Sequence, residues 1–118
     1  MKKVLIIEDE KPLRDVYALI LQTEGFKVAT AENGESGLKK LKAFNPDLII
    51  LDILMPVMGG KEFLETAKLK KNYPETNTII VSNLSDPIDD YQKYGVVECF
   101  LKVNLSPKEL AAVAKKFS

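Results

Sequence analysis

Five short apolar runs alternate with longer stretches of helical periodicity along this chain, and this alternation most constrains its fold. Three of the runs are unbroken series of Val, Ile and Leu, which is typical of parallel strands covered by helices on both faces. The alternation implies right-handed crossovers and a doubly wound α/β sheet. For five strands the expected order is 2-1-3-4-5. The strands are expected at 3–7, 26–30, 47–51, 78–82 and 97–101.

The segments between these runs carry residues that start or stop helices. Gly25 is a typical residue after a helix C-terminus, and the pair Asn45-Pro46 ends the second helix. Asn33 can cap the N-terminus of that second helix. Ser106 and Glu109 have the spacing of a capping box, so the last helix begins there.

The third and fourth helices follow from similar patterns. Phe63, Leu64 and Ala67 indicate a third helix, which is predicted to close at Tyr73-Pro74. The pair Asp86-Pro87 places proline at the first helical position and predicts a short fourth helix that ends at Gly95. Four lysines are interpreted as a solvated basic face on the third helix: Lys61, Lys68, Lys70 and Lys71.

Length and charge fit one globular domain spanning 1–118, with room for a single core. The 17 acidic and 17 basic side chains leave no net charge, so we expect no attraction to nucleic acid or to a membrane. No apolar run is long enough to span a bilayer or to act as a signal peptide. Cys99 is the only cysteine and histidine is absent, which excludes an internal disulfide and makes a cytoplasmic setting the expectation.

Four of the five apolar runs end in polar side chains suited to phosphate chemistry. Glu8-Asp9 follows the first run, Asp52 the third, Ser82 the fourth and Lys102 the fifth. The carboxyl ends of parallel strands meet at one edge of the sheet, which is where ligands bind in open α/β folds. The sequence therefore predicts that three carboxylates, a hydroxyl and an ammonium group gather into one site.

An all-oxygen pocket of Asp9 and Asp52, with Glu8 behind, suits Mg²⁺. Crowded carboxylates repel one another, so a divalent ion is the expected partner. Asp52 stands alone at a central strand end, which makes it the better candidate for a nucleophile that forms an acyl phosphate. Lys102 would then place a positive charge on the phosphoryl oxygens, and Ser82 would donate a hydrogen bond.

Each of these residues also has an ordinary structural explanation. An aspartate after a strand commonly caps a helix or forms a turn, a lone lysine such as Lys102 is commonly solvated, and Ser82 can form a turn. The run Glu8-Asp9-Glu10 could be the acidic first turn of a helix, which the helix dipole favours. Their joint occurrence at four strand ends favours a site over these explanations.

The same residues resemble the receiver domain of two-component response regulators, over essentially the whole chain. The resemblance rests on Val-Leu-Ile-Ile-Glu-Asp-Glu at 4–10, on the Asp-to-Pro segment at 47–56, and on Gly60, Ser82 and Lys102. It implies a CheY-like, flavodoxin-like (βα)5 fold. It also implies a phosphorelay protein whose phosphoacceptor receives its phosphoryl group from a sensor histidine kinase or a phosphotransfer protein.

The resemblance further implies a role for each site residue. Asp52 is the phosphoacceptor, Ser82 moves toward the phosphoryl group and Lys102 pairs with it. The implied ligands of Mg²⁺ are Asp9, Asp52 and the backbone carbonyl of Leu54, with Glu8 acting through water. No enzymatic activity is expected beyond self-phosphorylation from a donor and slow loss of the phosphate.

The output implied by the resemblance is a protein contact. The rearranged face would consist of the helix before Gly95, the strand 97–101 and the last helix. Because the sequence ends at residue 118, we expect this face to contact a separate downstream protein rather than an attached output domain.

The sequence departs from the family pattern at several positions. Val103 replaces the usual proline, Cys99 replaces the usual aromatic residue, and Asn83 replaces a small residue. The segment between Ser82 and Lys102 is also shorter than usual. Leu54 and Leu84 flank the path of a hydrolytic water and could neither orient nor activate it, which predicts slow autodephosphorylation.

The departures leave a second function open, a pseudo-receiver that binds a partner protein without being phosphorylated. The complete acidic triad argues against it. A phosphatase of the haloacid dehalogenase type needs a second acid where Leu54 stands. A flavodoxin-like electron carrier needs a phosphate-binding loop where Glu8-Asp9-Glu10 would repel phosphate.

Overall fold

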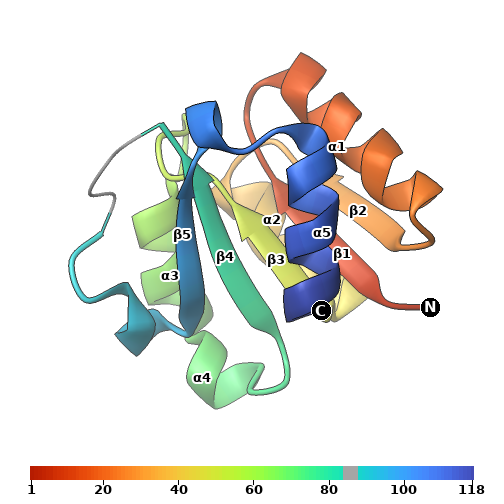
Figure 1. Ribbon diagram of the computed structural model, residues 1–118. Helices are drawn as coiled ribbons and strands as arrows, with labels where there is room; N and C mark the ends of the chain where they lie inside the picture. The colour runs from red at the N-terminus through yellow and green to blue at the C-terminus, as the bar shows by residue number, and fades with distance from the viewer. Residues whose placement is uncertain (84–87) are drawn as a thin grey trace.

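A five-stranded parallel sheet of order β2-β1-β3-β4-β5 forms the centre of the computed structural model, which describes residues 1–83 and 88–118 (Figure 1). The order and all five strands agree with the sequence prediction, although four of the five strands begin one residue away from the predicted start. The strands are β1 Lys3–Ile7, β2 Lys27–Ala31, β3 Leu48–Leu51, β4 Asn77–Ser82 and β5 Val96–Leu101.

Helices cover both faces of this sheet. Helices α1 and α5 pack beside each other on one face, and α2 and α3 cover the other (Figure 1). The helices are α1 Lys11–Thr23, α2 Gly34–Phe44, α3 Gly60–Ala67, α4 Leu69–Asn72 and α5 Pro107–Phe117, with short 3₁₀ helices η1 Tyr91–Tyr94 and η2 Lys102–Asn104. None of the described helices is long and apolar enough to cross a membrane.

The central strands are buried on both faces, as their unbroken apolar sequence predicts. Leu5 and Ile7 point into the cluster under α2 and α3, while Val4 and Ile6 point into the cluster under α1 and α5. All four are fully buried. This alternation follows from the two-residue period of a strand, and it holds the carboxyl end of β1 rigidly beside that of β3.

The predicted helix caps are present. The Asn33 side chain accepts a hydrogen bond from the backbone N–H of Ser36 at 2.9 Å, at the start of α2. The Ser106 hydroxyl accepts one from the N–H of Glu109 at 3.1 Å, and the Glu109 carboxylate accepts one from the N–H of Ser106 at 3.0 Å. Gly25, with φ of 94°, follows the end of α1 as predicted.

The third helix is shorter than predicted, because it breaks at Lys68 instead of running to Tyr73. Lys68 adopts a left-handed conformation with φ of 50°, and a separate turn, α4, follows. In an uninterrupted helix the next inward position after Ala67 would fall on lysines. The break instead turns Leu69 into the core, where it is 2% exposed. Burial of this leucine accounts for the interruption.

The fourth predicted helix is only partly described. Its proposed start at Asp86-Pro87 lies outside the described residues. Residues 88–90, which the prediction made helical, form a bend and a turn, and only the 3₁₀ helix η1 follows, ending before Gly95 where the predicted helix was to end. Gly95 has φ of 89°, a conformation that favours glycine, so this residue allows the chain to turn into β5.

Candidate functional site

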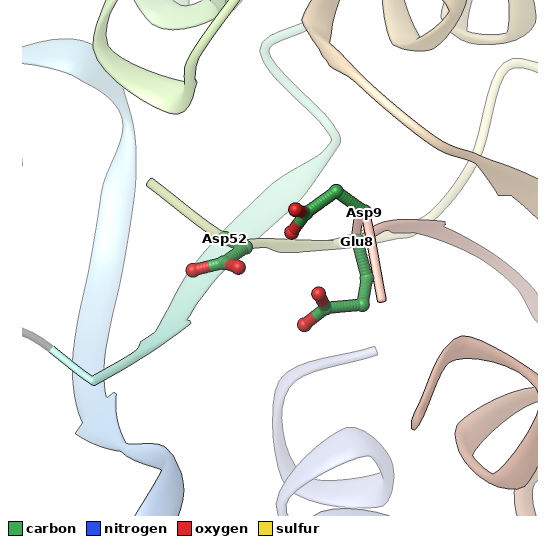
Figure 2. A group of neighbouring side chains, drawn as sticks. All are labelled: Glu8, Asp9 and Asp52. Atoms are coloured by element: carbon green, nitrogen blue, oxygen red, sulfur yellow. The ribbon is translucent and has the colours of Figure 1, made fainter. Parts of the chain in front are cut away.

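Three carboxylates gather at the carboxyl ends of β1 and β3. The two strands pair with Ile7 opposite Leu51, so the residues that follow each strand lie next to each other. Figure 2 shows the side chains of Glu8, Asp9 and Asp52 turned toward a shared space. One carboxylate oxygen from each lies within 4.8 Å of those of the other two. The sequence prediction that these acids meet is confirmed.

Lys102, at the end of β5, reaches into the same cluster. Its Nζ lies 2.7 Å from a carboxylate oxygen of Glu8 and 2.9 Å from one of Asp52. Burial by itself lowers the pKa of Lys102, but the hydrogen bonds to these two carboxylates outweigh it and raise the pKa above its usual value. The ammonium group is therefore charged at neutral pH and partly neutralises the acids.

Glu8 is the most deeply buried of the three acids, at 2% exposure. Burial raises its pKa to about 7, against the opposing effects of Lys102 and of the Glu10 backbone N–H, and the negative charge of Asp52 raises it further. The pocket thus holds more negative charge than Lys102 can offset. A further bound cation would favour the ionised form of Glu8.

The backbone around Asp52 holds its side chain in place. The N–H of Ile53 donates a hydrogen bond to Asp52 Oδ1 at 2.8 Å. The N–H of Gly60 donates to the carbonyl of Ile53 at 2.8 Å, which brings the start of α3 against the strand end. A Cβ at Gly60 would collide with the Asp52 carbonyl oxygen, so a residue other than glycine would push these segments apart.

The predicted site residues line one small cavity of about 130 Å³. Ser82 lies in its wall at the end of β4 and is 1% exposed. The lining consists of Asp9, Glu10, Asp52, Leu54, Ser82, Asn83 and Lys102. The structure thus places the predicted residues together, with Glu8 behind Lys102. The role of each, including a metal contact from the Leu54 carbonyl, remains a prediction.

Two supporting residues were missed by sequence reasoning. Glu10 lines the cavity, and its carboxylate lies 3.5 Å from Lys102 Nζ. Arg14 donates hydrogen bonds to the backbone carbonyls of Glu8 and Asp9, at 2.7 and 3.3 Å. Arg14 lies one helical turn after Glu10, and this spacing could have indicated that its side chain reaches back to the acidic run. Helix α1 begins at Lys11, so the acidic run precedes the helix and does not form its first turn.

Exposed apolar side chains occur in the segments that follow Asp52 and Lys102. Leu54, Val57 and Val103 are 67%, 75% and 82% exposed. Val57 also has φ of 69°, and the N–H of Met58 donates to the carbonyl of Pro56 at 2.8 Å. This is a γ-turn with a β-branched residue at its strained centre. The loop after the candidate phosphoacceptor therefore stores backbone strain.

The structure describes Cys99, which replaces the usual aromatic residue, but not Leu84. Cys99 is partly buried on the α3 side of the sheet, and burial, with a smaller effect of the Glu98 charge, raises the pKa of its thiol to about 11. Phe100, the neighbouring ring, packs on the opposite side against the cluster under α5. Leu84, predicted to flank the cavity, lies outside the described residues.

The donor set of the cavity fits Mg²⁺, which prefers oxygen ligands from one or two carboxylates. Glu8, Asp9 and Asp52 provide carboxylates alone, without nitrogen or sulfur ligands among them. Glu8 and Asp52 are buried, so water solvates their carboxylates poorly. The cluster therefore has both the chemistry and the excess negative charge that a small divalent cation requires.

Comparison with known proteins identifies the family of this chain. The chain matches the response regulator receiver domain family over residues 4–115. It is 37% identical over 89 residues to the transcriptional regulatory protein AfsQ1 of Streptomyces coelicolor, covering 75% of this chain and 38% of that protein. The chain spans half or less of the length of the curated relatives it matches.

Solved structures with the same architecture are also similar in sequence. A response regulator receiver domain protein (CheY-like) from Methanospirillum hungatei has a TM-score of 0.88 and 28% identity, covering 98% of this chain and 92% of that chain. The response regulator TrrA from Thermotoga maritima, solved in complex with Mg(2+)-BeF, has a TM-score of 0.85 and 34% identity, with each chain fully covered.

Proposed function

The chain belongs to the response regulator receiver domain family, and we propose that its Asp52 accepts a phosphoryl group from the phosphohistidine of a partner kinase or phosphotransfer protein. One observation carries this proposal above the others. Lys102 Nζ lies 2.9 Å from Asp52 at the edge of an acidic cavity, so a nucleophile, a fixed positive charge and a candidate metal site occupy the same small space.

In the proposed reaction a carboxylate oxygen of Asp52 attacks the phosphorus atom. The new O–P bond gives an acyl phosphate, the N–P bond of the donor breaks, and the imidazole leaves with the electron pair. Lys102 stabilises the charge on the phosphoryl oxygens, and the Ser82 hydroxyl donates to them. The hydrogen bond from Ile53 N–H to Asp52 Oδ1 keeps the carboxylate oriented for attack.

We expect Asp9, Asp52 and the backbone carbonyl of Leu54 to hold Mg²⁺, with Glu8 acting through water. Bound there, Mg²⁺ would offset the crowded carboxylates and polarise a phosphoryl oxygen. The all-carboxylate cluster of Glu8, Asp9 and Asp52 supports this assignment. The complex of TrrA with Mg(2+)-BeF shows that a similar protein binds magnesium.

Signalling is proposed to follow from the added charge. A phosphoryl group brings about −1.5 to −2 charge at neutral pH. Lys102 now bonds Asp52 and Glu8 at 2.9 and 2.7 Å, and it would exchange the Asp52 contact for the phosphoryl oxygens. Because Lys102 begins η2, this exchange would reach the loop before α5. The face of η1, β5 and α5 is proposed to contact a downstream protein.

Nucleic-acid contact is not expected of this domain itself. AfsQ1 is named as a transcriptional regulatory protein, and the present chain matches only 38% of it. The chain has no net charge, so it lacks the positive field that draws proteins to DNA. We therefore propose that the receiver acts through protein contacts.

The proposal is tested by incubating the protein with acetyl phosphate or phosphoramidate, with and without Mg²⁺, and measuring intact mass. We expect a gain of one phosphoryl group that requires Mg²⁺ and disappears in Asp52→Ala. Asp15→Ala, an exposed acid on α1, is the matched control and should be phosphorylated normally. A folded protein that gains no phosphate, or that gains it in Asp52→Ala, would show the proposal to be wrong. The first result would favour a phosphorylation-independent binding module.

The lifetime of the acyl phosphate is a second part of the proposal. We expect the domain to catalyse no reaction other than its own phosphorylation from a donor and the slow hydrolysis of its own acyl phosphate. Leu54 lines the cavity and is 67% exposed, so a water approaching the phosphoryl group meets an apolar side chain without a base. We expect Leu54→Asn to shorten the phosphate lifetime, because the amide can orient that water. Leu19→Asn is the control, because Leu19 on α1 is 66% exposed and does not line the cavity. Unchanged decay in Leu54→Asn would contradict the proposed role of the leucine.

A further inference from the structure

A second pocket, of about 320 Å³, lies between the α3–α4 segment and η1. It is at the amino-terminal end of the sheet, away from the acidic cavity at the carboxyl end (Figure 1). Its lining residues are Leu64, Glu65, Lys68, Leu69, Lys70, Lys71, Lys93 and Tyr94. None of these residues takes part in the proposed phosphorylation site, so the pocket has no role in that function.

The floor and one wall of this pocket are apolar. Leu64 and Leu69 are 1% and 2% exposed and belong to the core cluster under α3. Tyr94 packs partly against the same cluster, and its ring receives the Lys93 ammonium at 5.2 Å. The pocket therefore offers the partly exposed ring of Tyr94 to a planar group, with the buried side chains of Leu64 and Leu69 beneath it.

The rim of the pocket is strongly basic. Four lysines and one glutamate line it, in a chain whose overall charge is zero. Within residues 1–83 and 88–118, none of the four lysines forms an ion pair, whereas Lys11, Lys102 and Lys115 do. The ammonium groups of Lys68, Lys70 and Lys71 are therefore available to an external anion, and that of Lys93 could leave the Tyr94 ring to meet one.

The backbone of this region is shaped to form the pocket. Lys68 takes a left-handed conformation that ends α3 and redirects the chain into α4. The Asn72 side-chain amide donates to the Ala67 carbonyl at 3.1 Å and stabilises the break. Across the pocket, a Cβ added at Gly95 would lie 3.5 Å from the Leu69 side chain, so the two segments approach closely below the opening.

We propose that this pocket binds a small phosphorylated ligand with a planar ring, of the nucleotide class. The ring would lie against Tyr94, above Leu64 and Leu69, and the phosphates would meet the lysine rim. The volume falls at the lower end of the range for small-molecule sites, which favours a compact ligand over a peptide segment. The rim charge complements phosphates, since each lysine acts as a point charge for phosphate oxygens.

The test is a titration of the full chain with ATP, followed by ¹H–¹⁵N NMR, in metal-free buffer containing EDTA at low salt. Removal of metal keeps the acidic cavity repulsive to phosphate, so the result does not depend on the phosphorylation proposal. We expect shifts at the backbone amides of residues 68–71 and 93–95, with saturation at or below millimolar ATP. Adenosine and tripolyphosphate are titrated separately, and each alone should bind more weakly than ATP.

Charge-reversal variants distinguish binding in the pocket from a general effect of the protein's charge on ATP binding. Lys70→Glu and Lys93→Glu each reverse one rim charge and should weaken ATP binding by about tenfold. Lys61→Glu makes the same charge change on α3 outside the lining and should leave the affinity within about twofold. Both rim lysines are exposed, so the variants are expected to fold.

Several outcomes would overturn the proposal. They are no shifts at millimolar ATP, shifts confined to other regions, and equal weakening by Lys61→Glu. Tripolyphosphate or a polyglutamate peptide binding as tightly as ATP would also overturn it, because the site would then recognise charge without the ring. Each of these results leaves the Asp52 proposal intact, since phosphorylation is measured separately by mass.

Discussion

The two ends of the sheet carry opposite charge and hold it in different ways. At the carboxyl end, Glu8 and Asp52 are buried and share one ammonium group, that of Lys102. At the amino-terminal end, the lysines around the larger pocket are exposed and form no ion pair among the described residues. Burial makes the first set of charges dependent on one another, while solvent makes the second set nearly independent.

This difference separates the proposed site for chemistry from the proposed site for binding. Buried charges in an apolar surrounding interact strongly and can stabilise a developing charge, but they reduce stability when one partner is missing. Exposed lysines contribute little to stability, so they can be placed around a pocket at low energetic cost. Three sets of substitutions test these arguments, the first across both ends of the sheet and the other two each within one end.

The largest effect is expected from Lys102→Ala. It leaves Glu8 and Asp52 buried without a counter-charge and should lower the free energy of unfolding by about 3 kcal/mol at neutral pH. Lys115→Ala breaks an exposed pair with Glu24, at 3.0 Å, and should cost less than about 1 kcal/mol. Lys70→Ala, at the basic end, should change stability by less than about 0.5 kcal/mol. Urea denaturation measures all three.

Added Mg²⁺ sharpens this comparison, because a cation in the acidic cavity can replace part of the lost charge. It should restore some stability to Lys102→Ala and none to Lys115→Ala. Equal losses in the three variants without metal would show that the carboxyl end is no more interdependent than the exposed pairs.

An intermediate effect is expected at Val57, whose left-handed backbone is the strained feature of the carboxyl end. Asparagine tolerates this conformation better than a β-branched residue, so Val57→Asn should stabilise the protein by about 1 kcal/mol. Val103→Asn is the control, since Val103 is similarly exposed but has no positive φ. Thermal unfolding would show a higher midpoint for the first variant alone. A lower midpoint for Val57→Asn would contradict the strain argument.

The smallest effect is expected from two threonines at the amino-terminal end. The Thr78 hydroxyl is buried and has no hydrogen-bond partner among the described residues, whereas Thr76 Oγ1 donates to the Pro46 carbonyl at 2.7 Å. Thr78→Val should raise the free energy of unfolding by about 0.5 kcal/mol, because it removes an unsatisfied buried group. Thr76→Val should lower it by about the same amount. Chemical denaturation of both would decide, and a loss of stability in both would contradict the prediction.

Much of the candidate site could be predicted from sequence because parallel strands leave little freedom. Once Leu48–Leu51 is a buried strand beside Lys3–Ile7, Asp52 and Asp9 must meet at their carboxyl ends. The same reasoning brought Lys102 to the site from fifty residues away. Local patterns set the caps at Asn33 and Ser106, since those hydrogen bonds join residues three positions apart.

Other features depended on contacts between distant segments. Sequence periodicity extended the third helix past Lys68, because no local signal reported that Leu69 had to reach the core. The strain at Val57 arises where the loop must bring Gly60 against Asp52, and valine itself gives no sign of a left-handed backbone. The role of Arg14 as a donor to the Glu8 carbonyl likewise depends on how α1 leaves β1.

The sequence alone determined the sheet, its strand order and the meeting of Asp9, Asp52, Ser82 and Lys102 at one edge, because strand burial and strand direction are local, periodic properties. Only the tertiary structure decided which carboxylates pair with Lys102, where α3 breaks, and that four lysines surround an apolar pocket at the opposite end. These depend on side-chain positions within a few ångströms, and close packing between distant segments sets such positions.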